Sequence, residues 1–177
     1  MEFFDLVKSR KSIRMYTDEP VDDETVMKII DTARNSPSAG NLQPYKISIV
    51  RDLETKQELA KAAYGQGFIA RAPVVLVFLE EPAASASHYG RRGIELYVHQ
   101  DTAVAVTFAH LAAADLGLGS CWIGAFDSHA AARILDLPSG LHPVAILPIG
   151  HPAENPLSSP KKEINQIIHP GAKLREL

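Results

Sequence analysis

The sequence is poor in the features that define several large classes of protein. Its 177 residues include a single cysteine, Cys121, so no disulfide can form within the chain, and we expect a cytoplasmic protein. A net charge of −3 offers no strongly basic surface of the kind that binds nucleic acid. The longest apolar run, residues 72–79, is far shorter than the roughly 20 residues that span a bilayer. The sequence therefore predicts neither a nucleic-acid partner nor a membrane partner.

Familiar catalytic and metal-binding motifs are also missing. The sequence contains no H-E-x-x-H, C-x-x-C or G-x-S-x-G. His99 and His110 would share one face of a helix, but they would be about 16 Å apart at 1.5 Å per residue, too far to share an ion. The run GLGSCWIG from Gly117 lies between a predicted helix and a predicted strand, the reverse of a dinucleotide-binding loop. We predict no metal site and no Rossmann fold.

What the sequence does contain is a regular alternation of helix and strand signals, which we assign to one domain over residues 1–177. Asp22 and Asp52 are typical helix N-caps. The second half of a long helical segment is apolar nearly all round, which predicts a central helix ended by Gly117. Helices are expected at 3–9, between Asp22 and Pro37, and at 53–63, 92–116 and 128–137; strands are expected at 46–50, 73–79, 120–126 and 142–150.

The stretch RKSIR, residues 10–14, combines three cations with a serine. In an extended segment alternate residues share a face, which would bring together Arg10, Ser12 and Arg14. Two guanidinium groups and a hydroxyl on one edge suit a phosphate or a polyol. The alternative is a helix C-terminus whose cations interact with the helix dipole. The residues alone leave both interpretations open.

A second unusual stretch is SPSAGNLQPY, residues 36–45, between a predicted helix and a predicted strand. A simple helix stop at Pro37 followed by a stiff loop would explain it. The functional alternative is a rigid platform, in which Gly40 admits close approach to the backbone and Ser38, Asn41 and Gln43 supply donors and acceptors. A planar ligand rich in carbonyls and ring nitrogens would fit such an edge.

Taken in order, five segments resemble the FMN-dependent nitroreductase family: RKSIRMY, PSAGNLQPY, QGFIARAPVVLVF, LGLGSCWIGAF and PIGHPAENP. They cover most of the chain. The resemblance implies a dimeric α+β fold, with a central mixed, mainly antiparallel sheet flanked by helices and a long buried central helix. It also implies two FMN sites at the interface between the subunits.

The resemblance further implies which residues hold FMN, with the flavin itself carrying the chemistry. Arg10, Lys11 and Ser12 match the phosphate and ribityl end, and Arg14 matches a basic residue that tunes the ring. The ring edge corresponds to Gln66 and to the backbone of Ile123, Gly124 and Ala125. A wall from the other subunit corresponds to Pro37, Ser38, Ala39 and Asn41. The family often has a C-terminal arginine as a second phosphate anchor, and here Lys161 or Lys162 replaces it.

By the same resemblance we expect an oxidoreductase that uses NADH or NADPH to reduce nitroaromatic, quinone or similar small-molecule acceptors by a ping-pong mechanism. A low-turnover FMN-binding carrier or sensor is the alternative from another class. A related flavin reaction, such as dehalogenation or flavin fragmentation, is a third reading. The sequence does not choose between NADH and NADPH.

Overall fold

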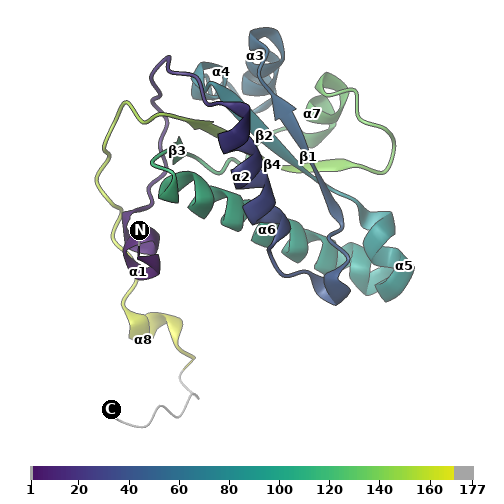
Figure 1. Cartoon of the computed structure of the whole chain (residues 1–177). Helices are drawn as coiled ribbons and strands as arrows, with labels where there is room; N and C mark the ends of the chain where they lie inside the picture. Colours follow the sequence, from purple (N-terminus) through teal and green to yellow (C-terminus); the bar gives the residue numbers. More distant parts are fainter. Residues whose placement is uncertain (1, 170–177) are drawn as a thin grey trace.

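The computed structural model describes residues 2–169, and its central feature is a four-stranded sheet (Figure 1). The strands are β1 (Tyr45–Val50), β2 (Val74–Glu80), β3 (Gly119–Ser120) and β4 (His142–Gly150). Their order across the sheet is β1-β2-β4-β3, and each neighbouring pair is antiparallel. A single parallel bridge joins Ser12 to Ser120 beside β3. The sheet is thus mainly antiparallel, with its parallel component at the edge that carries the RKSIR stretch.

Helices cover both faces of this sheet. The helices are α1 (Phe3–Ser9), α2 (Asp23–Arg34), α3 (Leu53–Ala62), α4 (Phe68–Arg71), α5 (Pro82–Arg92), α6 (Val98–Asp115), α7 (Ser128–Ile134) and α8 (Ile164–Ile167). A 3₁₀ turn, η1 (Ala39–Asn41), and a π-helical turn, η2 (Gly93–Tyr97), complete the set. Within residues 2–169, no helix has the length and apolar character that crossing a bilayer would require.

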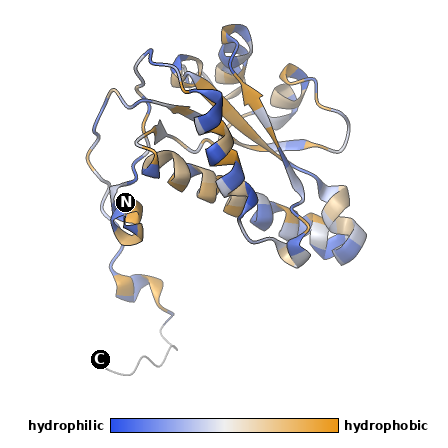
Figure 2. Ribbon diagram, in the orientation of Figure 1, coloured by the Kyte–Doolittle hydropathy of each residue, from blue (hydrophilic) through white to orange (hydrophobic). Residues whose placement is uncertain are grey.

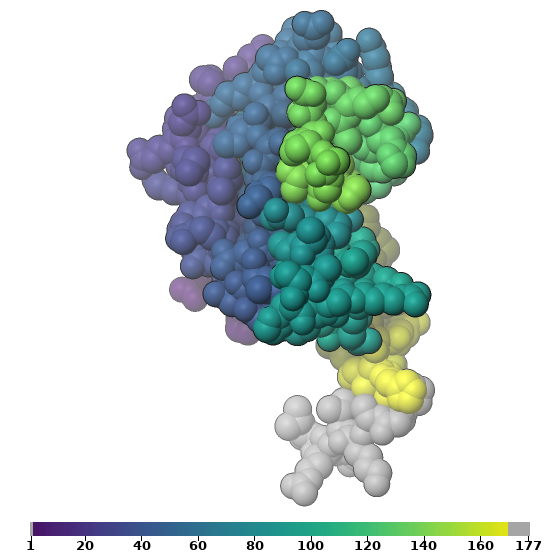
Figure 3. Space-filling model, turned by 90° about the vertical axis from the view of Figure 1, so that its right-hand side faces the viewer, coloured from purple at the N-terminus to yellow at the C-terminus, as the bar shows by residue number. Residues whose placement is uncertain are grey.

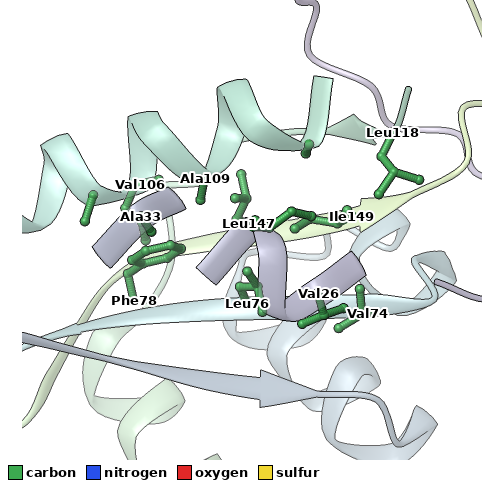
Figure 4. Close-up of a cluster of buried hydrophobic side chains, with 14 of the residues drawn as sticks. Val26, Ala33, Val74, Leu76, Phe78, Val106, Ala109, Leu118, Leu147 and Ile149 are labelled. Carbon is green, nitrogen blue, oxygen red and sulfur yellow. The ribbon is translucent and has the colours of Figure 1, made fainter. Parts of the chain in front are cut away.

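Strand β2 explains why two separate cores form. Its side chains alternate, so Leu76 and Phe78 face α2 and α6, whereas Val75 and Val77 face α3 and α7. All seven of its residues are buried, as the unbroken apolar run predicts. Figure 4 shows the first core, where Val74, Leu76 and Phe78 meet residues of α2, α6 and β4. The colouring in Figure 2 agrees, because the middle strands are the most hydrophobic part of the ribbon.

The predicted helix boundaries are mostly confirmed. Asp22 and Asp52 cap α2 and α3, their side chains accepting hydrogen bonds from the Thr25 and Thr55 N–H groups. Gly117 has φ of +76°, the left-handed conformation that follows many helix ends. Two predictions were too simple. The helix expected from residue 92 begins at Val98, after the π-helical turn η2. The strand expected over 120–126 is reduced to β3 and one bridge at Ile123.

Residues 10–16 are extended, not helical, and they lie against the edge of the sheet. The Ile13 N–H donates to the Ser120 carbonyl, and the Thr17 N–H donates to the His151 carbonyl. Close approach is possible because the chain has glycine at two contact points. A Cβ at Gly119 would lie 2.7 Å from Ile13, and a Cβ at Gly150 would lie 3.0 Å from Tyr16. Glycine at these two positions thus allows residues 10–16 to pack directly against the sheet edge.

The C-terminal segment leaves the body of the molecule after β4. It returns alongside α1 and then extends beyond it, where Figures 1 and 3 show α8 projecting from the rest of the chain. Leu157, Ile164 and Ile167 are exposed along it, at 97%, 75% and 70%. This segment therefore presents apolar side chains that the rest of the described chain does not cover.

The glycine contact can be tested directly. We expect Gly119→Ala to lower the free energy of unfolding by about 1–3 kcal/mol, because the new methyl group would overlap the rigid β-branched side chain of Ile13. Urea unfolding measures this change. Gly67→Ala is the matched control, since nothing lies within 4 Å of a Cβ there. Equal stability of the two variants would contradict the proposed packing.

Candidate functional site

A hollow lined by cations lies between the RKSIR stretch and the C-terminal segment. Its volume is about 460 Å³, within the usual range of small-molecule sites. Among residues 2–169, no aspartate or glutamate contributes to its lining, whereas three serines and five cations do: Lys8, Arg10, Lys11, Ser12, Arg14, Ser158, Ser159 and Lys161. We call it the cationic hollow. Such a lining suits an anion with several oxygens, because guanidinium, ammonium and hydroxyl groups all donate hydrogen bonds.

The cationic hollow brings together four residues that the sequence assigned to the phosphate and ribityl end of a flavin, namely Arg10, Lys11, Ser12 and Lys161. It also includes Arg14, which the sequence assigned to the ring. They come from the two ends of the chain, about 150 residues apart in sequence. Lys162, the other candidate anchor, is exposed and does not contribute to the lining. The structure thus places Lys161, but not Lys162, at this hollow.

Two residues near the C-terminus hold the RKSIR stretch in its extended form. The Glu154 carboxylate accepts from the N–H groups of Arg14 (2.5 Å) and Met15 (3.2 Å). Asn155 Oδ1 accepts from Lys11 Nζ at 2.7 Å. Charge-assisted bonds of this kind are among the stronger ones in proteins, so they fix which face of residues 10–14 is presented to the cationic hollow.

Behind the hollow, Arg10 is bonded to a buried histidine of α6. Arg10 Nη1 lies 2.7 Å from His110 Nε2, and His110 Nδ1 lies 2.5 Å from Ser120 Oγ. A guanidinium can only donate, so His110 Nε2 accepts and Nδ1–H donates to Ser120. Burial, and then the positive charge of Arg10, lower the pKa of His110 to about 4. The imidazole is therefore neutral near pH 7.

The residues predicted at the ring edge form a neighbouring group. Arg14 lies over the Phe68 ring, with its guanidinium carbon 5.9 Å from the ring centroid. Gln66 Nε2 donates to the Ala125 carbonyl at 3.1 Å, which joins the start of α4 to the segment after β3. Phe68 and Gln66 are close in sequence, so Arg14 and Ala125 flank the same short stretch of chain.

The three backbone groups predicted to face the ring are not equivalent. The N–H of Ile123 donates to the Ile146 carbonyl in a sheet bridge, so it is not free to approach a ligand. Its side chain is buried as well. Gly124 and Ala125 are exposed, and their N–H groups make no hydrogen bond within the described part of the chain. The backbone donors available at this position are therefore those of Gly124 and Ala125.

The loop that contains Pro37, Ser38, Ala39 and Asn41 lies elsewhere in the subunit. The Ala39 N–H donates to Asp101 Oδ1 near the start of α6, and Ser38 Oγ accepts from the Gln43 N–H. His110 follows Asp101 by nine residues, a separation of about 14 Å along a helix. Figure 1 shows this loop and the RKSIR stretch at opposite ends of α6. One subunit therefore does not bring the two predicted halves of the site together.

This loop is held by α5 as well as by α6. Tyr89 Oη lies 2.7 Å from the position that a Cβ on Gly40 would occupy, and Gly40 has φ of +56°. The Tyr89 ring packs edge-on against Tyr97, with centroids 4.9 Å apart. Asp101 Oδ2 is buried and has no hydrogen-bond partner within residues 2–169, and burial raises the pKa of this carboxyl. The loop thus lies against residues of both α5 and α6.

Sequence reasoning missed several residues of this arrangement, among them His110, Ser120 and Glu154. A signal existed for His110, because a polar ring on an otherwise apolar helix needs a hydrogen-bond partner once buried. No local pattern identified that partner. The lone thiol, Cys121, is buried, and its burial raises the pKa of the thiol, as expected for a small core side chain. Within the described residues, no cluster of His, Cys, Asp and Glu could hold a metal ion.

Comparison with known proteins gives a consistent result. The model of the nitroreductase family matches residues 7–68 and 62–151. An FMN reductase [NAD(P)H] of Bacillus subtilis is 34% identical over 90% of this chain and 69% of its own length. A putative NADH dehydrogenase/NAD(P)H nitroreductase of Archaeoglobus fulgidus is 31% identical over 86% and 87%. The solved NADPH:FMN oxidoreductase from Vibrio harveyi, complexed with NAD+, superposes with a TM-score of 0.87 at 26% identity, covering 98% of this chain and 78% of that one.

The buried histidine predicts a specific acid sensitivity of the protein without ligand. The pKa of His110 is about 4 in the folded protein and about 6.5 in an unfolded chain. Between these values only the unfolded chain binds the proton, so stability falls as the pH drops from about 6.5 to 4, by up to about 3 kcal/mol. Urea unfolding at several pH values measures this. His110→Gln should lose less stability over that window, and parallel profiles would contradict the assignment.

Proposed function

The chain belongs to the nitroreductase family, and from this premise we propose that it is an NAD(P)H-dependent flavin oxidoreductase with FMN as its cofactor. The observation that carries the proposal is the cationic hollow, to which the described part of the chain contributes five cations and no carboxylate although the net charge is −3. A phosphate monoester carries close to two negative charges near pH 7, which fits this lining. The names of the relatives in Bacillus subtilis and Vibrio harveyi, both of which include FMN, support the same cofactor.

The residues of the chain divide the work of holding FMN. Arg10, Lys11, Ser12 and Lys161 would bind the phosphate and ribityl end, since they line the cationic hollow. Arg14 would lie at the polar edge of the ring, close to Gln66 and to the N–H groups of Gly124 and Ala125. Glu154 and Asn155 hold the extended stretch that carries the arginines, so the donors are in place before FMN binds.

FMN, when bound, would supply the redox chemistry, taking a hydride from NADH or NADPH and passing electrons to a nitroaromatic, quinone or similar acceptor in separate half-reactions. The protein supplies binding, orientation and electrostatic field. Arg14 is exposed and cationic, so it would favour the negative charge of reduced flavin. No dedicated acid–base pair is needed, in agreement with a site whose titratable groups are mainly cations.

The site would be completed by a second copy of the chain. The loop at residues 37–41 lies at the far end of α6 from Arg10, so a wall contributed by that loop must come from a partner subunit. The outer face of α6 supports this. Phe108, Leu111 and Leu116 of the α6 region line an apolar hollow of about 430 Å³ with Phe3 and Leu6. An apolar surface of this kind is typical of subunit interfaces.

The proposed cofactor site predicts how three substitutions should differ. Arg10→Ala should weaken FMN binding roughly ten- to a hundredfold, because it removes a charge-assisted contact to the phosphate. Arg14→Ala should weaken binding only modestly but lower the flavin reduction potential and slow reduction by NAD(P)H. Lys161→Ala should act as a milder Arg10→Ala, and Lys162→Ala is its matched control. FMN titration, potentiometry and anaerobic mixing with NADH and NADPH measure these effects.

Each outcome has a clear meaning. Rapid bleaching of the flavin by NADH or NADPH supports a reductase, whereas bound flavin that neither nucleotide bleaches would identify a carrier or sensor. Protein that stays colourless after incubation with FMN would contradict the proposal as a whole. If Arg10→Ala leaves FMN affinity unchanged, the cationic hollow does not bind the phosphate.

The dimer has its own test. We expect sedimentation to show a homodimer at micromolar concentration, and Leu111→Glu to shift it toward monomer by burying an unpaired charge at the interface. The same variant should lose FMN affinity, since each site needs both subunits. Gln57→Glu, on the exposed face of α3, is the control and should stay dimeric. A monomer that binds FMN with full affinity would refute the shared site.

A further inference from the structure

We propose that His110 is a positioning residue for FMN binding: it holds the Arg10 guanidinium in the orientation that receives the flavin phosphate. The inference rests on the proposed function, because it assigns a role toward the same cofactor. It concerns a residue of the central helix α6 that does not line the cationic hollow itself.

The first argument is the geometry of the contact. Arg10 lines the cationic hollow, and its Nη1 lies 2.7 Å from His110 Nε2. A guanidinium has five N–H donors, and the hydrogen bonds among residues 2–169 use only this one. The remaining donors are available to a ligand in the hollow. The single hydrogen bond to His110 therefore orients the Arg10 side chain and leaves its other N–H donors available to a ligand.

The second argument is that His110 is itself fixed. It is 7% exposed, and its Nδ1 donates to Ser120 Oγ at 2.5 Å. Ser120 belongs to β3 and forms the bridge with Ser12, which is another residue of the hollow. The ring can therefore neither rotate nor exchange its two nitrogens without breaking the Ser120 bond. Arg10 is connected through this chain of contacts to the sheet and not to a mobile surface group.

The third argument concerns charge. Elsewhere in the chain Arg34, Arg51 and Arg91 pair with carboxylates, namely Asp31, Asp23 and Glu95. A carboxylate beside Arg10 would neutralise it and compete with the phosphate. Neutral His110 orients the guanidinium and leaves its charge intact for an anionic ligand. A buried neutral imidazole is thus a partner suited to an arginine that binds an anion.

The opposing interpretation is structural: His110 would serve only to join α6 to β3 through Ser120. Two conservative substitutions separate the interpretations, because each preserves one of the two bonds. Gln can place its side-chain oxygen near the position of Nε2 and accept from Arg10. Asn can place its amide N–H near Nδ1 and donate to Ser120, but it is too short to reach Arg10. His110→Met fills the space and preserves neither bond.

The experiment compares FMN with riboflavin, which lacks the phosphate, in fluorescence titrations of each full-length variant. If His110 positions Arg10, His110→Met and His110→Asn should lose about tenfold in FMN affinity, whereas His110→Gln should stay within about threefold of the unsubstituted protein. Riboflavin affinity should not change in any of them. In an Arg10→Ala background, His110→Met should cause no further loss of FMN affinity, because the residue that it positions is gone.

The contrary outcomes are equally distinct. A loss of riboflavin and FMN affinity in equal proportion, or additive effects of the Arg10 and His110 substitutions, would overturn the positioning role. The positioning role would also be overturned if His110→Asn bound FMN more tightly than His110→Gln, because the Asn side chain preserves only the bond to Ser120. Unsubstituted protein that binds neither flavin would overturn the proposed function itself. Thermal unfolding of each apoprotein verifies that the variants compared are folded.

Discussion

The site depends on one packing constraint, the close contact of residues 10–16 with the β3–β4 edge. Ile13 lies so close to Gly119 that a Cβ there would overlap it, and Gly150 is enclosed by Pro73 and Tyr16, which would lie 2.5 and 3.0 Å from a Cβ. With Ile13 buried and the segment extended, alternation directs Arg10, Ser12 and Arg14 to the other side. A side chain at Gly119 would push this segment away from the sheet edge and displace the cations that it carries. Packing at the sheet edge thus determines the chemistry of the cationic hollow.

Helix α6 relates this edge to the rest of the proposed site. His110 near its C-terminal end contacts Arg10, and Asp101 near its N-terminal end holds the loop at Ala39. A rigid helix fixes the separation of these two features within a subunit, so they cannot converge on one small molecule. Two copies arranged about a twofold axis can place the loop of one beside the arginines of the other. In this arrangement each subunit contributes one part of each flavin site, and the flavin sites lie in the subunit interface.

Local patterns in the sequence predicted most of the fold and part of the site. The Asp22 and Asp52 caps and the buried run at β2 depend on neighbouring residues, so periodicity and capping rules identified them. The extended form of RKSIR depends on Glu154, some 140 residues away, and could not be decided locally. The Arg10–His110 bond likewise spans 100 residues. Such features arise from tertiary contacts that no single window contains.

The distribution of charge shows how an acidic protein can bind an anionic cofactor. The chain carries a net charge of −3, yet the residues that the structure describes line the cationic hollow with five cations and no acid. Attraction of a phosphate therefore depends on short-range arrangement, since charges more than about 10 Å apart are screened at moderate salt. Glu154, an acid close to the RKSIR stretch, accepts hydrogen bonds from backbone N–H groups and leaves the Arg14 guanidinium over Phe68. The neutral imidazole of His110 has a similar effect on Arg10, because it orients the guanidinium without neutralising it. The full positive charge of Arg10 therefore remains available to the ligand.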